Sequence, residues 1–236
     1  MVKVYSVKIE NLEYNICDAL PFLSEERKYR IKKMRQTSDQ IRSIVAETMI
    51  RLLIMREYNI KNKKIRLSFN DYGKPFLEGV PNFNFNLSHS GSYILCSTSK
   101  HPVGIDVEKV NHINLDVAKH FFTKEEIAFI NKADTGIRVE RFYSIWTAKE
   151  SYIKFLGRGL SVPLTSFGIK IDNNSISISN EEFNQKKHFP CYFKSYDKFD
   201  KYKVTLCSKS HNQPDAIYEI EYNKLFEEFM KLVYRN

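Results

Sequence analysis

The chain has 236 residues, which is enough to bury a sizeable core as one large domain or two small ones. Its formal charge of +9 and pI near 9.2 indicate an anionic partner: nucleic acid, an acidic protein or a phosphorylated small molecule. No apolar run is long enough to span a bilayer, and the N-terminus lacks the apolar core of a signal peptide. We therefore expect a cytoplasmic protein with no membrane partner.

The first hundred residues predict a strand, two helices and a group of strands. Residues 1–15 alternate like a strand, and residues 23–60 have helical periodicity with a break near residues 37–39. Ser24 is the expected N-cap of the first helix. Two short extended segments follow at 64–77, and two more strands at 83–99 meet at a bend over Ser88 to Ser92.

The second half predicts a strand, two helices, a run of strands with polar turns and a final helix. These elements cover residues 103–110, 121–133, 138–157, 167–209 and 223–235. Thr123 and Glu126 have the spacing of a capping box, and Gly157 ends the longer helix. Because the order helix, helix, strands occurs twice, we expect two halves of similar build, 1–102 and 103–236.

The four cysteines, at positions 17, 96, 191 and 207, lie far apart and include no Cys-x-x-Cys pair. This spacing argues against a zinc knuckle or a redox dithiol. We expect reduced thiols, most of them buried.

Two carboxylates stand two positions apart in the expected strand "VGIDVEKV" at 103–110. In a strand Val103, Ile105 and Val107 share one face, so Asp106 and Glu108 share the other. Such neighbours repel and raise each other's pKa unless a cation compensates them. A solvated polar face explains the pattern as well as a magnesium site does, although hard oxygen ligands of this kind suit magnesium.

The helix at 138–157 places Trp146, Glu150 and Lys154 one turn apart on a single face. Its alternative explanation is an exposed Glu–Lys pair, which is common. In "LSHSG" the bend residues Ser88 and His89 are placed to reach a ligand, but no Gly-x-Ser-x-Gly elbow surrounds any serine, which argues against a serine hydrolase.

The first helix is rich in arginine and lysine, with Arg27 and Arg30 at helical spacing. Usually a run of this kind is a solvated face. Its functional interpretation is phosphate binding, because an arginine fork can grip phosphate oxygens in a bidentate way.

Together these residues resemble the Sfp-type 4'-phosphopantetheinyl transferases. The resemblance covers roughly residues 24–170 and depends on four segments: "YGKP" at 72–75, "FNLSHSG" at 85–91, "VGIDVEK" at 103–109 and "FYSIWTAKESYIKFLGRGLSVPL" at 142–164. The most specific part is Gly-Ile-Asp-x-Glu followed by Trp-x-x-Lys-Glu-x-x-x-Lys. The chain after about residue 170 matches no pattern of the family.

The resemblance implies an enzyme that moves the phosphopantetheine arm of coenzyme A onto a serine of an apo acyl or peptidyl carrier protein and releases adenosine 3',5'-bisphosphate. It implies that Asp106, Glu108 and Glu150 hold magnesium on the pyrophosphate. Glu150 would accept the serine proton, and Lys154 would stabilise the departing phosphate. Glu126 and a metal-bound water are the alternatives for the base.

The resemblance also implies the coenzyme A site. Arg27, Arg30 and His89 match positions that grip the 3'-phosphate. The nucleotide and phosphate pocket would use Lys74, Pro75 and Ser88, Lys149 would meet the phosphates from the last helix, and Arg42 with Ser43 would approach the adenine. The implied fold is α+β: a monomeric pseudo-dimer of two α/β halves, 1–102 on the coenzyme A side and 103–236 on the magnesium side, with the active site between them.

Two alternatives use the same features. A magnesium-dependent nuclease would also need paired carboxylates, a lysine and a basic surface, but its usual Glu-x-Lys spacing is missing. A nucleic-acid-binding module would explain the charge, but no aromatic RNA-binding strand motif is present. We expect no nucleic-acid partner. The carrier protein and its pathway do not follow from the sequence.

Overall fold

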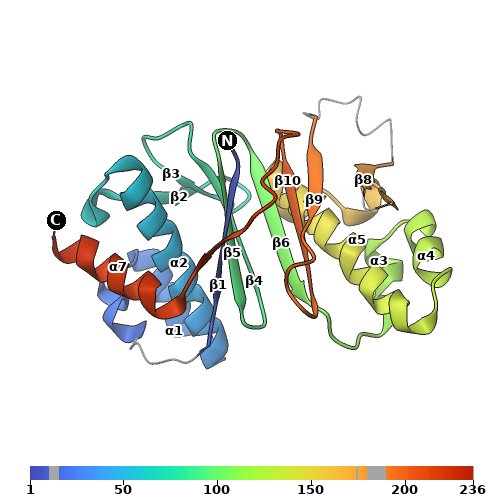
Figure 1. Cartoon of the computed structure of the whole chain (residues 1–236), viewed down its shortest axis with the longest axis horizontal. Coiled ribbons are helices and arrows are strands. Elements are labelled where there is room, and N and C mark those ends of the chain that lie inside the picture. Colours follow the sequence, from blue (N-terminus) through green and yellow to red (C-terminus); the bar gives the residue numbers. More distant parts are fainter. Residues whose placement is uncertain (11–15, 174, 180–189, 236) are drawn as a thin grey trace.

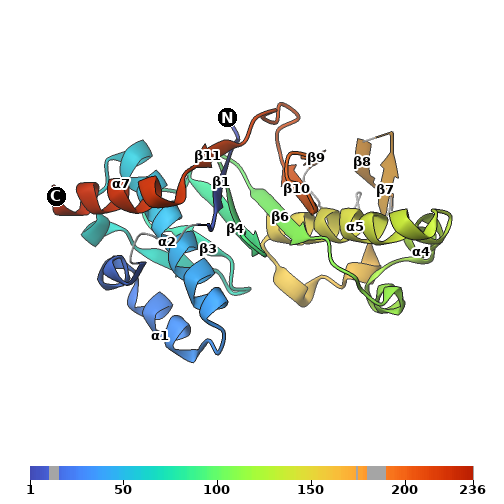
Figure 2. The same cartoon turned by 60° about the horizontal axis from the view of Figure 1, so that its bottom comes forward.

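A computed structural model gives the fold and describes residues 1–10, 16–173, 175–179 and 190–235. Two lobes stand side by side, with their sheets in the middle and their helices on the outer sides (Figure 1). The turned view in Figure 2 shows the same division. The fold is therefore α+β, as the sequence predicts. Parts of the expected strand regions, residues 11–15 and 180–189, lie outside the described residues.

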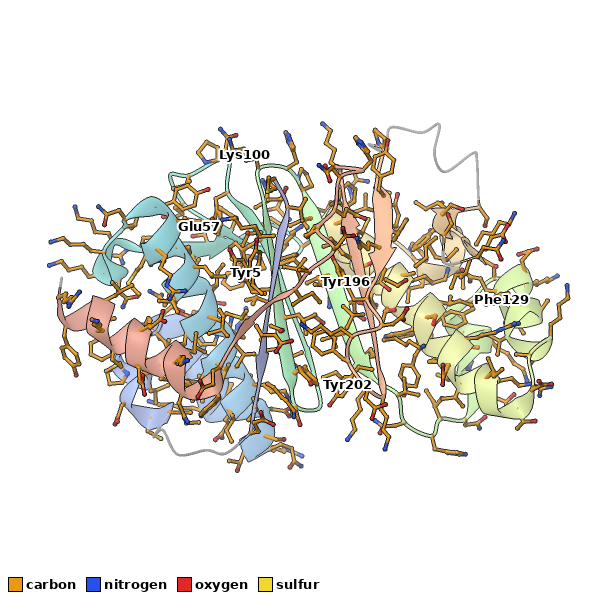
Figure 3. The ribbon with its side chains drawn as sticks, viewed as in Figure 1. Tyr5, Glu57, Lys100, Phe129, Tyr196 and Tyr202 are labelled. Atoms are coloured by element: carbon orange, nitrogen blue, oxygen red, sulfur yellow. The ribbon has the colours of Figure 1, made fainter. Side chains whose placement is uncertain are left out.

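Apart from residues 11–15, the first hundred residues give the N-terminal lobe five strands and two α-helices. In chain order they are β1 (Lys3–Lys8), α1 (Glu25–Lys33), α2 (Thr37–Tyr58), β2 (Leu67–Phe69), β3 (Pro75–Leu77), β4 (Asn84–Ser90) and β5 (Tyr93–Ser99). The Ser24 hydroxyl accepts a hydrogen bond from the Arg27 amide, so Ser24 caps α1 as expected. Tyr5 on β1 reaches across to Glu57 on α2, where its hydroxyl donates at 2.9 Å (Figure 3).

The described residues of the C-terminal lobe repeat this order with five strands and three α-helices. They are β6 (Val103–Lys109), α3 (Ala118–Phe121), α4 (Lys124–Asn131), α5 (Thr135–Leu156), β7 (Ile169–Asp172), β8 (Ser175–Ile178), β9 (Tyr192–Ser195) and β10 (Tyr202–Ser208). Thr123 and Glu126 form the predicted capping box of α4. Gly157 ends α5 in the left-handed conformation at φ 67°, which glycine adopts without steric strain.

The two lobes share one topology. Strand order β1-β5-β4 in the first sheet corresponds to β6-β10-β9 in the second, and the small hairpin β2–β3 corresponds to β7–β8. All these neighbours are antiparallel. Helices α2 and α5, each 22 residues long, cover equivalent faces. The expected pair of similar halves is thus visible in the fold.

The end of the chain leaves the C-terminal lobe. Strand β11 (Tyr218–Ile220) pairs in parallel with β1, and helix α7 (Tyr222–Tyr234) packs beside α2. Leu225, Phe226 and Phe229 are fully buried in the core of the N-terminal lobe. The division 1–102 and 103–236 is therefore wrong at its end, because an amphipathic helix finds its apolar partner surface on the first lobe.

Side chains join the two sheets at the seam between β4 and β6. The side-chain oxygens of Asn86, Ser88 and Ser90 accept hydrogen bonds from three backbone amides of β6, those of Ile105, Val107 and Lys109. A separate hydrophobic cluster fills the space between the lobes and includes Val103, Ile105 and Val107. The apolar face of β6 thus packs against the N-terminal lobe, as the alternation predicts, and its polar face turns toward α5.

The predicted bend at Ser88 to Ser92 is narrower in the structure. Strand β4 continues to Ser90, and only Gly91 and Ser92 form the turn to β5. Gly91 has φ 54°, and a Cβ there would lie 2.3 Å from the Tyr202 hydroxyl. Ser88 and His89 are therefore strand residues on opposite faces of β4, one buried and one exposed.

Candidate active site

Asp106 lies at the centre of the seam, 2% exposed, on the face of β6 that packs against α5. Its Oδ1 accepts hydrogen bonds from the Ser88 hydroxyl at 2.8 Å and from the Lys154 ammonium at 2.5 Å. Lys154 Nζ also contacts the Ser88 oxygen at 3.0 Å. The structure thus brings together one residue from each of β4, β6 and α5.

Glu108 extends the same face toward solvent. Its carboxylate accepts a hydrogen bond from Ser90 Oγ at 2.8 Å and another from the Trp146 indole. Burial and the neighbouring Asp106 charge raise the pKa of Glu108. The repulsion that the sequence predicted between the two carboxylates is therefore present in the fold.

Glu150 faces the other two carboxylates from α5. Burial raises its pKa, and the charges of Asp106 and Glu108 add to this shift, while the Lys154 ammonium opposes it. Within the described parts of the chain, no hydrogen bond or ion pair is formed by the Glu150 side chain. A carboxylate that is partly buried, surrounded by like charge and unpaired favours a cation as its neighbour.

Magnesium fits the chemistry of these donors. All three are hard carboxylate oxygens, and Asp106 Oδ2 is buried with no hydrogen-bond partner. Among the residues that the structure describes, however, no three acidic, histidine or cysteine side chains converge closely enough to hold an ion by themselves. Magnesium usually keeps waters and substrate phosphates in its coordination shell, so an incomplete protein cage suits it.

Positive charge borders the carboxylates at the end of β4. Loss of hydration around the ring lowers the pKa of His89, and the charges of Arg42 and Lys154 lower it further, although the side chain lies at the surface. Arg42 is fixed by Asp39 at 2.5 Å and by the Gly91 carbonyl at 3.1 Å. A phosphate placed here would meet the cationic groups of Arg42 and Lys154, from α2 and α5, and the imidazole of His89 on β4.

Arg27, Arg30 and Pro75 line a common shallow hollow beside α1. The buried Glu47 carboxylate holds Arg27 Nε at 3.0 Å, and Ser43 accepts from its Nη1 at 3.1 Å. Arg30 is more exposed, pairs with Glu26 and lies over the Phe69 ring. The predicted phosphate-binding arginines are thus neighbours, and Arg27 is held in one orientation.

Lys149 does not lie with the predicted phosphate ligands. It is 0% exposed, donates to the carbonyls of Leu164 and Phe167, and forms an ion pair with Glu126 at 2.9 Å. One step along a helix turns a side chain by about 100°, so Lys149 faces the core when Glu150 faces the seam. We withdraw Lys149 from the candidate site.

Glu126, the ion-pair partner of Lys149, is also buried. Its carboxylate accepts hydrogen bonds from the amides of Thr123 at 2.7 Å and Ile169 at 2.6 Å, in addition to the Lys149 ion pair. These contacts occupy the group inside the C-terminal lobe. Glu126 is therefore not placed to act as the base.

Lys74 also has another environment than the one predicted. Its ammonium donates to the backbone carbonyls of Val103, Lys154 and Phe155 at 3.0, 2.6 and 3.5 Å. Burial lowers the pKa of Lys74 to about 8. These acceptors are the start of β6 and the end of α5, not a nucleotide pocket.

Two residues that contact the site, Asn86 and Ser90, were not singled out from the sequence. Trp146 was singled out, but not as a partner of Glu108. A signal for the first two was present, because "NFNLSHS" alternates small polar residues on one face of a strand. Trp146 stood on the helix face with Glu150. Its hydrogen bond to Glu108 depends on how α5 crosses β6, and the helical periodicity of the sequence does not predict that crossing.

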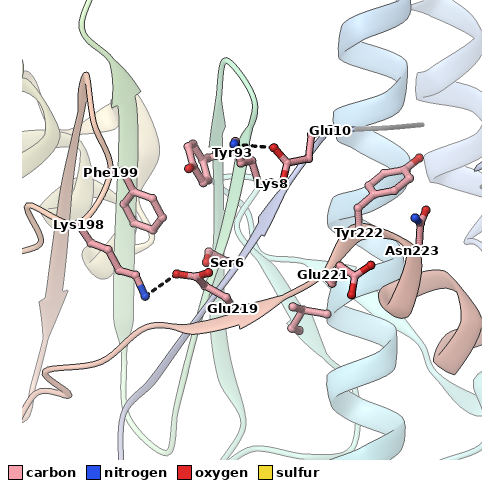
Figure 4. A pocket seen from close by; sticks show the side chains of 11 residues that line it. Ser6, Lys8, Glu10, Tyr93, Lys198, Phe199, Glu219, Glu221, Tyr222 and Asn223 are labelled. Atoms are coloured by element: carbon pink, nitrogen blue, oxygen red, sulfur yellow. Dashed lines mark ion pairs between the residues drawn. The ribbon is translucent and has the colours of Figure 1, made fainter. Parts of the chain in front are cut away.

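A hollow of about 380 Å³ lies elsewhere, between β1, the loop before β10 and the start of α7 (Figure 4). Two ion pairs border it, Lys8 with Glu10 and Lys198 with Glu219. None of the candidate site residues lines it. This hollow therefore gives no support to the candidate site, which depends on the chemistry of the carboxylates.

Glu108→Gln tests whether the carboxylates of Asp106 and Glu108 repel each other in the metal-free chain. Because the folded-state pKa of Glu108 is raised, stability is lost as pH rises through that pKa and the group ionises. Without magnesium, we expect the Tm of the variant to exceed that of the wild type by about 2–4 °C at pH 7, the shift that ~1 kcal/mol produces at this size. The difference should shrink at pH 4. If the Tm difference between variant and wild type stays constant from pH 7 to pH 4, the Glu108 carboxylate is not the source of the repulsion.

Comparison with known proteins identifies the family. The chain matches the model of the 4'-phosphopantetheinyl transferase superfamily over residues 102–207 and that of the 4'-phosphopantetheinyl transferase N-terminal domain over residues 10–101. These two matches meet at the boundary between β5 and β6.

Curated relatives agree with the family matches. The chain is 34% identical to 4'-phosphopantetheinyl transferase Sfp of Bacillus subtilis, covering 87% of this chain and 91% of the relative. It is 32% identical to 4'-phosphopantetheinyl transferase gsp of Aneurinibacillus migulanus, covering 88% and 86%. A solved holo-(acyl-carrier-protein) synthase of Bacillus anthracis, in complex with CoA, covers 45% of this chain and 93% of its own at 18% identity, with a TM-score of 0.39.

The chain belongs to the 4'-phosphopantetheinyl transferases, and its relatives over most of the length are of the Sfp type. It is an enzyme that transfers phosphopantetheine from coenzyme A to carrier proteins. The nuclease and the nucleic-acid-binding module receive no support from these comparisons. Within the described residues, no helix is long and apolar enough to cross a membrane.

Proposed function

We propose that Asp106, Glu108 and Glu150 hold magnesium during this transfer, with Lys154 beside them. The observation that carries the proposal is the meeting of these four groups from β6 and α5, with raised pKa values for Glu108 and Glu150. A bound magnesium ion would neutralise charge on the pyrophosphate of coenzyme A. The unpartnered Asp106 Oδ2 supports the same assignment.

In the proposed reaction the carrier serine attacks the phosphorus that bears the pantetheine arm. A new O–P bond forms, the bond to the bridging oxygen breaks, and adenosine 3',5'-bisphosphate leaves. Glu150 accepts the serine proton, because it is the unpaired carboxylate and its raised pKa suits a base. Lys154 stabilises the departing phosphate; its side chain is 26% exposed, so it can reach a ligand while it contacts Asp106.

The test of the function is the mass of a carrier protein. Incubation with coenzyme A, magnesium and an apo acyl or peptidyl carrier protein should add one phosphopantetheine group to the carrier. Chelation of magnesium should stop the reaction. An unchanged carrier mass with several apo carriers would contradict the proposal, and so would equal transfer in the presence of a chelator.

We further propose that one chain forms the whole site and acts as a monomer, because both lobes contribute residues to the seam. Sedimentation of the active protein tests this. A cytoplasmic location and the absence of nucleic-acid partners remain predictions, tested by cell fractionation and by a binding assay with duplex and single-stranded DNA and RNA.

Arg27→Ala and His89→Ala test the phosphate site. If these residues bind the 3'-phosphate, each variant should bind coenzyme A more weakly by about 1.5–3 kcal/mol, since a charge-assisted hydrogen bond is lost. Dephospho-coenzyme A, which lacks that phosphate, should bind as it does to the wild type. Isothermal titration measures both ligands. Arg35→Ala, at an exposed arginine beside the same helix, is the control; equal losses for both ligands would place Arg27 and His89 elsewhere.

A further inference from the structure

The hairpin β2–β3 of the N-terminal lobe reaches the far end of α5 in the C-terminal lobe. Its turn, residues 70–74, is held by Asn70, whose Oδ1 accepts hydrogen bonds from the amides of Tyr72 at 3.0 Å and Lys74 at 2.8 Å. Gly73 adopts φ 82° within it. This self-bonded turn is therefore a defined structure and not a loose loop.

From the turn, two side chains bind the carboxyl end of α5. The Asn70 amide donates to the Gly157 carbonyl at 2.8 Å, and the Lys74 ammonium donates to the carbonyls of Lys154 and Phe155. The last carbonyls of a helix lack partners within the helix, and they carry its negative dipole end. The Lys74 ammonium supplies hydrogen-bond donors for these carbonyls and a positive charge for the dipole end.

The fit leaves little freedom at the end of α5. A Cβ on Gly157 would lie 2.9 Å from Lys74 Cδ, and a Cβ on Gly104 would lie 2.1 Å from the Ser151 carbonyl oxygen. Lys74 also holds the Val103 carbonyl at 3.0 Å, so it ties the start of β6 to the end of α5. No carboxylate in the described residues forms an ion pair with it.

Lys154 is consequently held at two points. Its backbone carbonyl accepts from Lys74 at 2.6 Å, while its ammonium contacts Asp106 at 2.5 Å and Ser88 at 3.0 Å. A shift of the last turn of α5 would move the Lys154 side chain away from both partners. A displacement of about 1 Å in such a group is enough to slow an enzyme about a hundredfold.

We propose that Lys74 is a positioning residue for Lys154: from the opposite lobe it fixes the last turn of α5 and so aims the Lys154 ammonium. Asn70 assists it, and neither side chain needs to contact coenzyme A. This inference rests on the proposed role of Lys154 in the transfer.

Kinetics separate positioning from substrate binding. For Lys74→Met we expect kcat to fall about tenfold to a hundredfold, with the KM for coenzyme A within about twofold of the wild type. Lys64→Met, at an exposed lysine just before the hairpin, is the control and should match the wild type. A large rise in KM with unchanged kcat would make Lys74 a ligand of coenzyme A and overturn the proposal.

A double-mutant cycle tests the coupling to Lys154. In a Lys154→Met background, adding Lys74→Met should change kcat by less than about twofold, because the group that Lys74 positions is already gone. If the two effects instead multiply, Lys74 acts independently of Lys154 and the proposal fails.

Two further measurements keep the proposal testable if Lys74→Met folds poorly or if the transferase assay fails. Asn70→Asp keeps an oxygen that can build the turn, removes the donor to Gly157 and places a negative charge beside the Gly157 carbonyl, so it should lower kcat severalfold at unchanged KM. Amide hydrogen exchange over residues 151–157 should be faster in both variants than in the wild type. Unaltered exchange would contradict the positioning role. Faster exchange in a chain that transfers nothing would refute the proposed function alone.

Discussion

Asp106→Ala should slow carrier modification by about a thousandfold, the loss expected when several kcal/mol of metal-dependent stabilisation disappears. The chain should stay folded, because the substitution also removes a buried oxygen that has no hydrogen-bond partner. Lys154 loses its ion pair but is partly exposed, so water can solvate its ammonium. Turnover measured by carrier mass, together with a thermal melt, checks both statements.

The matched control for this substitution is Asp116→Ala. Asp116 is an exposed acid, 67% accessible, whose ion-pair partner is Lys119 on the surface. It should keep wild-type turnover and magnesium dependence. If Asp106→Ala instead unfolds the chain while magnesium still binds, Asp106 is a structural residue.

Glu150→Gln should slow transfer by about 10²–10⁴-fold, the range for loss of a positioned base, while coenzyme A still binds. The glutamine keeps the length and one oxygen but has neither the charge nor the basicity. In the wild type, the rate should rise with pH through the raised pKa of Glu150, because the base must be deprotonated. That limb of the pH profile should be absent from the variant.

Glu140→Gln, an exposed glutamate on the same helix, is the control for Glu150 and should retain both the rate and the pH profile. The decisive experiment is titration with magnesium. If saturating magnesium returns Glu150→Gln to wild-type turnover, Glu150 is a metal ligand only. The base would then be a metal-bound water, since Glu126 is buried in the C-terminal lobe.

Local patterns predicted what depends on neighbours in the sequence. Alternation assigned Asp106 and Glu108 to one face of β6, and cap spacing placed the start of α4 at Thr123. The doubled order of elements predicted two similar halves. In the first two cases the physical signal, a period or a hydrogen bond between near residues, lies within a few positions.

What the sequence missed depends on how elements meet. Lys74 and Lys149 carry the same charge as true phosphate ligands, but the packing of α5 directs their ammonium groups to backbone carbonyls. The family motif marked both positions without showing what their side chains contact. Similarly, no local pattern indicated that α7 returns to the first lobe. An amphipathic helix requires an apolar partner surface, but its sequence does not say which lobe provides that surface.

The return of α7 bears on the order in which the molecule matures during synthesis. Residues 103–208 supply all the described strands and helices of the C-terminal lobe from one continuous segment, so this lobe can fold while the ribosome is still working. The N-terminal lobe, although made first, lacks β11 and three fully buried side chains of its core until the last residues emerge. The half that is translated first is thus the half that is completed last, and a premature stop before residue 222 would leave it with an open apolar groove along α2.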